Sequence, residues 1–274
     1  MKPPRNVSEL ESALRRIGGT DENGYRLRCI MADVVAGQFL TGAVLRGGSS
    51  LKMRYGNATT RFTVDFDVAR RLGEEEFIEK FNERLVSGWM DFSGRLVKEP
   101  KAAPRDVPPE YVMQPYSLKL TYAKRPWCTV ALEVAYNEIG DADEQDLVPV
   151  PDDIKSLFSR LNFPEPSPIP VMLVEYQFAQ KLHGATDPRG CRAQDLVDLQ
   201  LIMARESLNH ARLRLICERL FANRKRQAWP SFISVTDTLR PKYDYSRSNM
   251  DVLPDVNQAI AAINDFIQEI AQNS

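Results

Sequence analysis

Apolar and polar residues alternate through the first half of the chain, and this period of two predicts β-strands. The strand-like segments are a short apolar step at 43–45 and alternating runs at 60–68, 117–122 and 129–136. Ala-Lys-Arg-Pro-Trp joins the last two and predicts a hairpin. Helical periodicity at 26–40 and 74–90, and a capping-box spacing of Ser8 and Glu11, add helices. We therefore expect a mixed β-sheet with flanking helices.

The second half of the chain has mainly helical periodicity. It occurs at 171–186, 193–205, 211–224 and 256–271. Between 138 and 170 the chain becomes acidic and then rich in proline, which is typical of a boundary between subdomains. These patterns predict an α+β protein, with a sheet-containing domain at 1–150 and an α-helical bundle at 151–274.

A glycine turn follows the apolar step. Gly47 and Gly48 break the strand, and Ser49 and Ser50 are suitable N-cap residues for a helix that ends at Gly56. The local order is therefore strand, turn, helix. Backbone N–H groups and a hydroxyl at such a helix start favour an anion, and the missing side chains permit its close approach.

Composition narrows the class of protein. With 274 residues, 43% of them hydrophobic, the chain is long enough for one large domain or two ordinary ones. The formal net charge of -1 means that nucleic acid or membrane would have to meet a local patch. The four cysteines and two histidines show no metal-ligand spacing, which argues against a zinc site or a disulfide framework. Without an apolar leader or a run of ~18 apolar residues, we expect a cytoplasmic protein.

The run at 60–68 carries two carboxylates. The face expected to be buried comprises Phe62, Val64, Phe66 and Val68. Asp65 and Asp67 share the other face, about 7 Å apart along the backbone, so their oxygens can hold one or two hard cations such as Mg²⁺. Glu133 is the candidate third acid, on a predicted strand face that it shares with the small residues Ala131 and Ala135.

Together the turn and the acids predict nucleotidyl transfer. Phosphates would lie on the glycine turn, and metal ions held by the acids would stabilise the attacking and leaving oxygens. Each feature also has a simpler interpretation: the glycines as an ordinary turn, the two aspartates as a solvated sheet face, and Glu133 as an exposed acid paired with Lys119 or Lys124.

The motifs GGSSL, RFTVDFD, ALEV and EYQFAQKLHGATDPRGCRAQDLVDLQLI, spread over residues 45–202, resemble those of the AbiEii/AbiGii-type nucleotidyltransferases. These are the toxins of bacterial type IV toxin-antitoxin pairs and belong to the polymerase β-like superfamily. The resemblance implies a nucleotidyltransferase-type sheet in the N-terminal domain, with a helical domain that completes the active-site cleft. It also implies an NTP substrate, Mg²⁺ and a cognate antitoxin.

Carried over residue by residue, the resemblance implies the site. Nucleotide binding would fall to Gly47, Gly48, Ser49 and Lys181, metal binding to Asp65, Asp67 and Glu133, and catalysis to Asp65, Asp67, Lys181 and Asp195. Asp198 matches the second acid of the family's D-x-x-D ending. The family often has Arg directly before the first of these acids, whereas here Gln194 stands there, which leaves Arg189 and Arg192 as alternatives.

The helical residues of this set also have physical roles of their own. Lys181 on its helix would reach the triphosphate as a point charge, or would be an ordinary exposed lysine. Asp195 and Asp198 share a helix face and would orient Lys181 or the acceptor hydroxyl. Alternatively, Asp195 is an acid favoured by the dipole at the start of its helix.

The acceptor is indicated by a basic segment. Residues 211–226 hold six Arg or Lys against one Glu, and the candidate RNA contacts among them are Arg212, Arg219, Arg224, Lys225 and Arg226. Family members include enzymes that add nucleotides to tRNA 3′ ends, so tRNA is the implied acceptor and blocked translation the implied outcome. A solvated face, or a surface for an acidic antitoxin, explains the same charges. A protein or small-molecule acceptor, or an inert domain that only binds a nucleotide or a partner, remains the alternative.

Overall fold

The computed structural model describes residues 2–102, 112–187, 190, 192–236, 239–248 and 250–272. The chain divides into two compact units, one up to Met172 and one from Leu173 onward. We had expected the division between residues 150 and 151. Residues 151–172 belong instead with the sheet, because a strand within them pairs into it and a helix within them packs on its covering layer.

The N-terminal unit holds, in its described residues, a seven-stranded mixed sheet and five helices. Its helices are α1 (Val7–Gly18), α2 (Asp21–Phe39), α3 (Gly47–Tyr55), α4 (Glu74–Ser87) and α5 (Asp152–Arg160). Its strands are β1 (Ala43–Arg46), β2 (Asp65–Arg70), β3 (Phe92–Lys98), β4 (Gln114–Tyr122), β5 (Arg125–Ala135), β6 (Asp146–Val148) and β7 (Ile169–Val171). An α+β fold with a mixed sheet is therefore confirmed.

The order of strands brings distant segments together. Across the sheet the order is β3-β4-β5-β2-β1-β7-β6, so β2 lies between β5 and β1. β2 runs parallel to β5 and antiparallel to β1, and β1 runs parallel to β7. The glycine turn after β1 and the acids on β2 and β5 therefore come from neighbouring strands.

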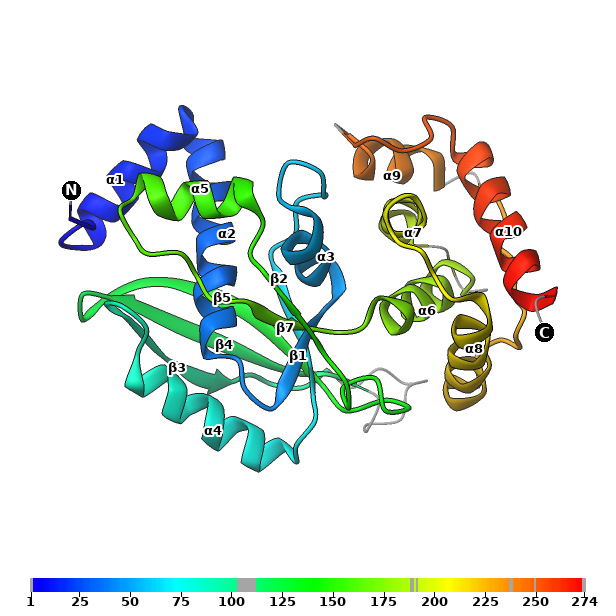
Figure 1. Cartoon of the computed structure of the whole chain (residues 1–274), viewed down its shortest axis with the longest axis horizontal. Coiled ribbons are helices and arrows are strands. Elements are labelled where there is room, and N and C mark those ends of the chain that lie inside the picture. The colour runs from blue at the N-terminus through cyan, green and yellow to red at the C-terminus, as the bar shows by residue number, and fades with distance from the viewer. Residues whose placement is uncertain are drawn as a thin grey trace. The chain divides into compact units, whose positions relative to one another are not determined.

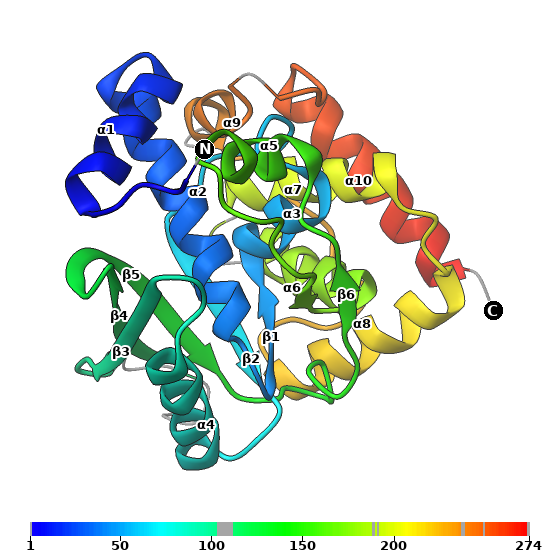
Figure 2. The ribbon, with the colours of Figure 1, turned by 60° about the vertical axis from the view of Figure 1, so that its left-hand side comes forward.

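One face of the sheet is covered by helices. Figures 1 and 2 both show α2 lying across the strands, and Val34 and Val35 of α2 share one hydrophobic core with Phe66 of β2 and Leu132 of β5. Side chains alternate along a strand, so Asp65, Asp67, Ala131 and Glu133 lie on the opposite face. The core thus positions the acidic face without occupying it.

The predicted elements differ from the observed ones mainly at their ends. α1 is capped by Asn6, whose side chain accepts a hydrogen bond from the Glu9 N–H, and the expected cap residue Ser8 lies inside the helix. α2 begins at Asp21 after an Asn23 N–H to Thr20 cap, earlier than the expected start at 26. The first turn of α2 is polar, and helical periodicity is recognised from apolar positions. The pattern therefore did not predict this earlier start.

The strand expected at 60–68 is β2, and it begins only at Asp65. Phe66 and Val68 are buried as expected, but Val64 is 44% exposed. The alternating pattern includes Phe62 and Val64, but a strand forms only where a neighbouring strand pairs with it. Because the pairing with β5 begins at Asp65, β2 also begins there. The hairpin between β4 and β5 has a two-residue turn, Ala123–Lys124, with positive φ at both positions, shorter than the five residues expected.

The C-terminal unit is, in its described residues, a set of five helices. They are α6 (Val174–Ala185), α7 (Ala193–Arg205), α8 (His210–Arg224), α9 (Leu239–Ser246) and α10 (Val256–Gln272). Four match the predicted segments, whereas α9 was not predicted. Rings of Phe178 on α6 and Phe266 on α10 meet edge to face at 5.5 Å between centroids, which ties the ends of the unit together. Among the described helices, none has the length and apolar character needed to cross a membrane.

Candidate active site

The glycine turn lies against the first of the acid-bearing strands. Gly47 begins α3 with φ of +68°, in the left-handed region, and a Cβ there would be 2.5 Å from Oδ2 of Asp67. A Cβ at Gly48 would be 3.1 Å from the Arg61 guanidinium and 3.2 Å from Thr63. Both the backbone conformation and the space therefore require glycine at position 47. The absent side chain leaves the helix start and the Asp67 carboxylate in direct apposition.

The two serines after the turn do not cap the helix. Arg46 is the N-cap residue and makes no side-chain cap bond, while Ser49 and Ser50 are fully buried within α3. The Ser49 hydroxyl donates to the backbone oxygen of Asp65 at 2.6 Å. The hydroxyl therefore holds the start of β2 in place, whereas the sequence predicts that it faces an anion. Any phosphate contact of Ser49 falls to its backbone N–H.

The three predicted metal ligands lie on one sheet face. In the β2–β5 register Asp67 stands opposite Glu133, and Asp65 stands opposite Ala131. Asp65 is exposed and the other two acids are half-buried. Their oxygens are the donors that Mg²⁺ prefers, and the space kept open at Gly47 adjoins Asp67. The part of the chain that the structure describes contains no preassembled group of three or more His, Cys, Asp or Glu side chains that could hold a metal. The donor chemistry of the three carboxylates fits a hard cation such as Mg²⁺.

A buried ion pair supports this site from within the unit. Nζ of Lys52 on α3 lies 3.3 Å from Oδ2 of Asp33 on α2 and donates to the Thr63 backbone oxygen at 3.2 Å. The two side chains are 0% and 3% exposed. Burial raises the pKa of Asp33 to about 6, opposed by Lys52 and reinforced by the neighbouring charge of Asp65. The pair therefore lies within electrostatic range of Asp65.

The sequence patterns did not predict this ion pair, although each of its two residues stands among apolar neighbours in the sequence. Asp33 interrupts the otherwise apolar run from Ile30 to Ala36 on α2, and Lys52 stands between Leu51 and Met53 on α3. A single charged residue inside an apolar segment indicates a buried partner, since an isolated buried charge is very costly. Nothing local identifies which partner, because the two residues lie on different helices.

The C-terminal unit contains the other predicted catalytic residues as one cluster. Nζ of Lys181 on α6 lies 2.5 Å from Oδ2 of Asp198 and 3.3 Å from Oδ1 of Asp195, both on α7. All three residues are buried, so Lys181 is not an ordinary exposed lysine. A Cβ at Gly184 would lie 2.6 Å from Oδ2 of Asp195, so a larger residue there would disturb the cluster.

The aspartates hold the lysine in place. Burial raises the pKa of Asp195, with Lys181 acting in the opposite direction and Asp198 adding to the rise. Arg192 is the N-cap residue of α7 and also lowers the pKa of Asp195, which places its charge near the cluster. Arg189, the alternative arginine, lies outside the described residues.

The predicted RNA contacts lie on or just beyond α8. Arg212, Arg219, Lys225 and Arg226 are exposed, whereas Arg224 is half-buried. Arg226 pairs with Asp187 at 3.3 Å, so part of its charge is already used. Lys225 and Arg226 also line a cavity of about 590 Å³, which Trp229 lines as well. Cationic side chains beside an aromatic ring are suited to nucleic acid, and equally to another anionic surface.

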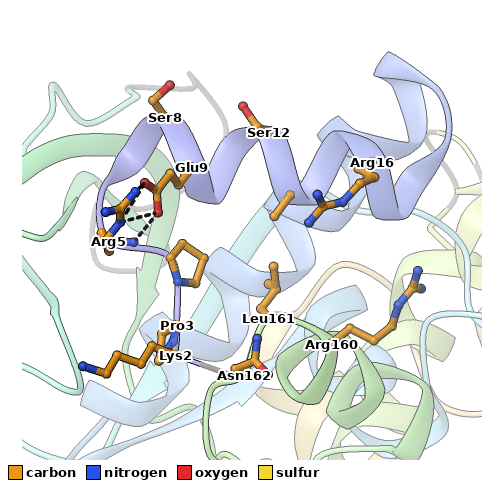
Figure 3. Close-up of a pocket in the computed structure, with 12 residues that line it drawn as sticks. Lys2, Pro3, Arg5, Ser8, Glu9, Ser12, Arg16, Arg160, Leu161 and Asn162 are labelled. Atoms are coloured by element: carbon orange, nitrogen blue, oxygen red, sulfur yellow. Dashed lines mark hydrogen bonds and ion pairs between the residues drawn. The ribbon is translucent and has the colours of Figure 1, made fainter.

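A further basic cavity lies at the N-terminal end of the first unit. It has a volume of about 450 Å³ and is lined from the N-terminal segment, α1 and α5, as Figure 3 shows. Arg5 is bound to Glu9 at 2.6 Å, while Arg16 and Arg160 are exposed. None of the predicted site residues lines it. It is therefore distinct from the candidate active site.

Comparisons with known proteins identify the family and the fold of this chain. The family model described as the nucleotidyl transferase AbiEii toxin of type IV toxin-antitoxin systems matches residues 29–271. Among solved structures, MenT4, a nucleotidyltransferase toxin of Mycobacterium tuberculosis, is 15% identical with a TM-score of 0.59, and the match covers 96% of this chain and 90% of that one.

Two Helicobacter pylori structures are more distant in shape. JHP933 is 16% identical with a TM-score of 0.45, and the match covers 88% of each chain. A structure described as a nucleotidyltransferase is 18% identical with a TM-score of 0.45, covering 88% of this chain and 91% of that one. The comparison with curated protein sequences gave no match.

Proposed function

Because the chain belongs to the AbiEii family of nucleotidyltransferase toxins of type IV toxin-antitoxin systems, we propose that it transfers nucleotides from an NTP to the 3′ end of tRNA in a Mg²⁺-dependent reaction. Modified tRNA would no longer be aminoacylated, and translation would stop. The observation that carries the proposal is the apposition of the Gly47 turn to Asp67, which itself stands opposite Glu133.

In this proposal the N-terminal unit supplies the metal and phosphate sites. Asp65, Asp67 and Glu133 hold Mg²⁺, which when bound stabilises charge on the attacking and leaving oxygens. Backbone N–H groups at Gly47 and Gly48 bind phosphate oxygens at the start of α3, where the helix dipole favours negative charge. Ser49 has a positioning role, because its hydroxyl donates a hydrogen bond to the Asp65 backbone oxygen.

Lys181 of the helical unit is proposed to bind a phosphate oxygen of the NTP. A compact ammonium suits a phosphate oxygen as a point charge, and Asp195 and Asp198 keep it in a defined position at low entropic cost. Asp195 thereby acts through Lys181 rather than on the substrate directly.

The exposed basic residues of α8 are proposed to bind the tRNA backbone. Arg212, Arg219 and Lys225 are exposed, and phosphate contacts need charge rather than sequence information. A cognate antitoxin is the further partner that the family implies. If the basic face binds that antitoxin, the acceptor would be a protein or a small molecule, which is the alternative function.

One incubation tests the proposal. Purified protein is mixed with labelled NTPs, Mg²⁺, total RNA and protein extract, and the label is followed to its product. Label on tRNA supports the proposal, label on protein or a small molecule supports the alternative, and no label on any product would point to an inert binding domain.

Asp65→Ala and Asp67→Ala are expected to abolish transfer and toxicity while leaving the melting temperature nearly unchanged, because they remove like charges from a metal-free cluster. Asp91→Ala, at an exposed turn, is the matched control.

A further inference from the structure

An aromatic and cationic cluster lies beside the start of β2, outside the residues assigned so far. The rings of Tyr25 and Phe62 meet edge to face at 6.3 Å between centroids. The Arg28 guanidinium lies 5.1 Å from the Tyr25 ring centroid, and that of Arg26 lies 5.2 Å from the Phe62 centroid. Tyr25 is 46% exposed, so one large aromatic ring is presented to solvent with a cation beside it.

The cluster borders a cavity of about 360 Å³ within the N-terminal unit. Tyr25 and Trp127 form aromatic walls, Ala131 gives an apolar lining, and Arg28 and Asp33 contribute one charged group of each sign. Aromatic and apolar walls with a few polar groups are typical of a small-ligand site, and the volume suits one nucleobase. The cavity exists because β2 begins only at Asp65, so the preceding part of β5 has no β2 residue opposite it.

Glu11 of α1 holds two walls of this cavity together. It accepts a hydrogen bond from Nε1 of Trp127 at 2.7 Å and lies 3.7 Å from the Arg28 guanidinium. Trp127 is only 9% exposed and its N–H is satisfied. The aromatic wall is therefore fixed before any ligand binds, which lowers the entropic cost of binding.

The position of the cavity relative to the acids suggests which base it receives. The glycine turn approaches β2 from the β1 side, whereas the cavity lies on the β5 side, where Val64 precedes Asp65 and Ala131 stands opposite Asp65. The glycine turn therefore adjoins Asp67, whereas the cavity adjoins Asp65 at the edge of the helix-covered face. In an in-line transfer the attacking hydroxyl and the leaving phosphates lie on opposite sides of the reacting phosphorus.

Resting on the proposed function, we propose that this cavity binds the terminal nucleobase of a single-stranded RNA acceptor, stacked on Tyr25 with Arg28 beside it. Base-on-aromatic stacking tolerates any base, and arginine adds a cation–π contribution. The chemistry therefore selects a free single-stranded 3′ end over a paired one, because only an unstacked base can enter.

Binding is measured in an Asp65→Asn background, which prevents turnover. The probe is a 5′-labelled single-stranded RNA oligonucleotide with a free 3′ hydroxyl, and mononucleotide NTPs are titrated separately. Tyr25→Ala is expected to weaken oligonucleotide binding about tenfold or more, the size of one base stack, with NTP affinity unchanged. Tyr25→Phe should bind like the parent, because the stacking face is retained. Tyr245→Ala, at a residue 86% exposed in the C-terminal unit, is the matched control and should change neither affinity.

Other outcomes overturn the inference. If Tyr25→Ala weakens NTP binding and leaves oligonucleotide binding unchanged, the cavity receives the base of the donor nucleotide instead. If the parent does not bind the oligonucleotide, or Tyr25→Ala binds it equally well, the cavity is not an RNA site. These readings need no turnover, so they are separate from the labelling experiment: label on protein alone would refute the tRNA acceptor whatever Tyr25 does.

Discussion

Lys52 of α3 and Asp33 of α2 form an ion pair of 3.3 Å inside the N-terminal unit, with both side chains almost fully buried. The same ammonium donates to the Thr63 backbone oxygen, two residues before Asp65. Because Ser49 also holds the Asp65 backbone, the start of β2 is fixed from two positions on one helix. The pair therefore links the stability of the unit to the placement of Asp65.

Lys52→Met should lower the free energy of unfolding by about 3–5 kcal/mol, because it leaves Asp33 buried without its counter-charge. The double variant Lys52→Met, Asp33→Leu should recover most of that stability, which gives a favourable coupling energy in a double-mutant cycle. Chemical denaturation measures both. Lys80→Met, which removes an exposed i,i+4 pair with Glu76, should change stability by less than about 0.5 kcal/mol. Additive effects of the changes at Lys52 and Asp33 would contradict the pairing.

The raised pKa of Asp33 predicts a pH dependence of stability. Burial raises this pKa from 3.8 to about 6, so between those values the folded protein binds a proton that the unfolded chain does not. The contribution of Asp33 is complete below pH 3.8 and is lost as pH rises through 6, with a slope of at most about 1.4 kcal/mol per pH unit. The difference in unfolding free energy between wild type and Asp33→Asn should fall across that window. A difference that rises with pH would show that Lys52 overcomes the effect of burial.

Gly47→Ala should disrupt nucleotide binding more than Gly48→Ala. The added methyl would meet Oδ2 of Asp67 at 2.5 Å in a backbone conformation with φ of +68°, whereas at Gly48 the nearest atom is 3.1 Å away on a flexible arginine. Left-handed backbone alone costs a non-glycine residue about 1–2 kcal/mol. NTP affinity and thermal melting measure the two effects. Gly73→Ala, where no atom lies within 4 Å, is the control, and equal behaviour of all three would refute the phosphate role of the turn.

Lys181→Ala should reduce transfer by orders of magnitude and weaken NTP binding. Lys181→Arg should restore the reaction only in part, because a forked guanidinium does not replace a compact ammonium held at 2.5 Å from Asp198. Since Lys181→Ala also leaves two carboxylates buried, denaturation of the same variants separates stability from activity. If Lys181→Ala kept both NTP affinity and rate, its triphosphate role would be wrong.

Removal of the basic residues of α8 should change the salt dependence of tRNA binding. Each RNA phosphate that the protein no longer neutralises lowers the slope of log affinity against log salt by about 0.7–0.9, so the variant with Ala at Arg224, Lys225 and Arg226 should have a shallower slope. NTP binding should be unchanged. Ala at Arg15 and Arg16, two exposed residues of α1, controls for the removal of positive charge elsewhere. Equal slopes and affinities would show that α8 is a solvated or partner-facing surface and would favour a protein or small-molecule acceptor.

The local pattern of apolar residues and glycines was sufficient to predict several elements of the N-terminal unit. The apolar step, Gly47, Gly48 and the end at Gly56 predicted the strand and the helix that are observed as β1 and α3, although α3 begins at Gly47 itself rather than after a glycine turn. Four helices of the C-terminal unit also followed from periodicity. These features depend on side-chain periods and backbone freedom within a few residues, which a single sequence carries directly. The same local signal misplaced the cap of α1, since Asn6 and Ser8 are both suitable residues.

The tertiary structure alone decided which distant residues meet. Strands β6 and β7 have three residues each, too few for a period of two to be recognised, and β3 has no regular alternation of buried and exposed residues, so periodicity did not predict them. The register that sets Asp67 opposite Glu133 joins residues far apart in the chain. Likewise, the partners of Lys52, Lys181 and the Ser49 hydroxyl follow from packing between elements. The sequence by itself determined which residues can carry the chemistry, and the tertiary structure decided their partners, because pairing depends on three-dimensional packing that local periodicity does not encode.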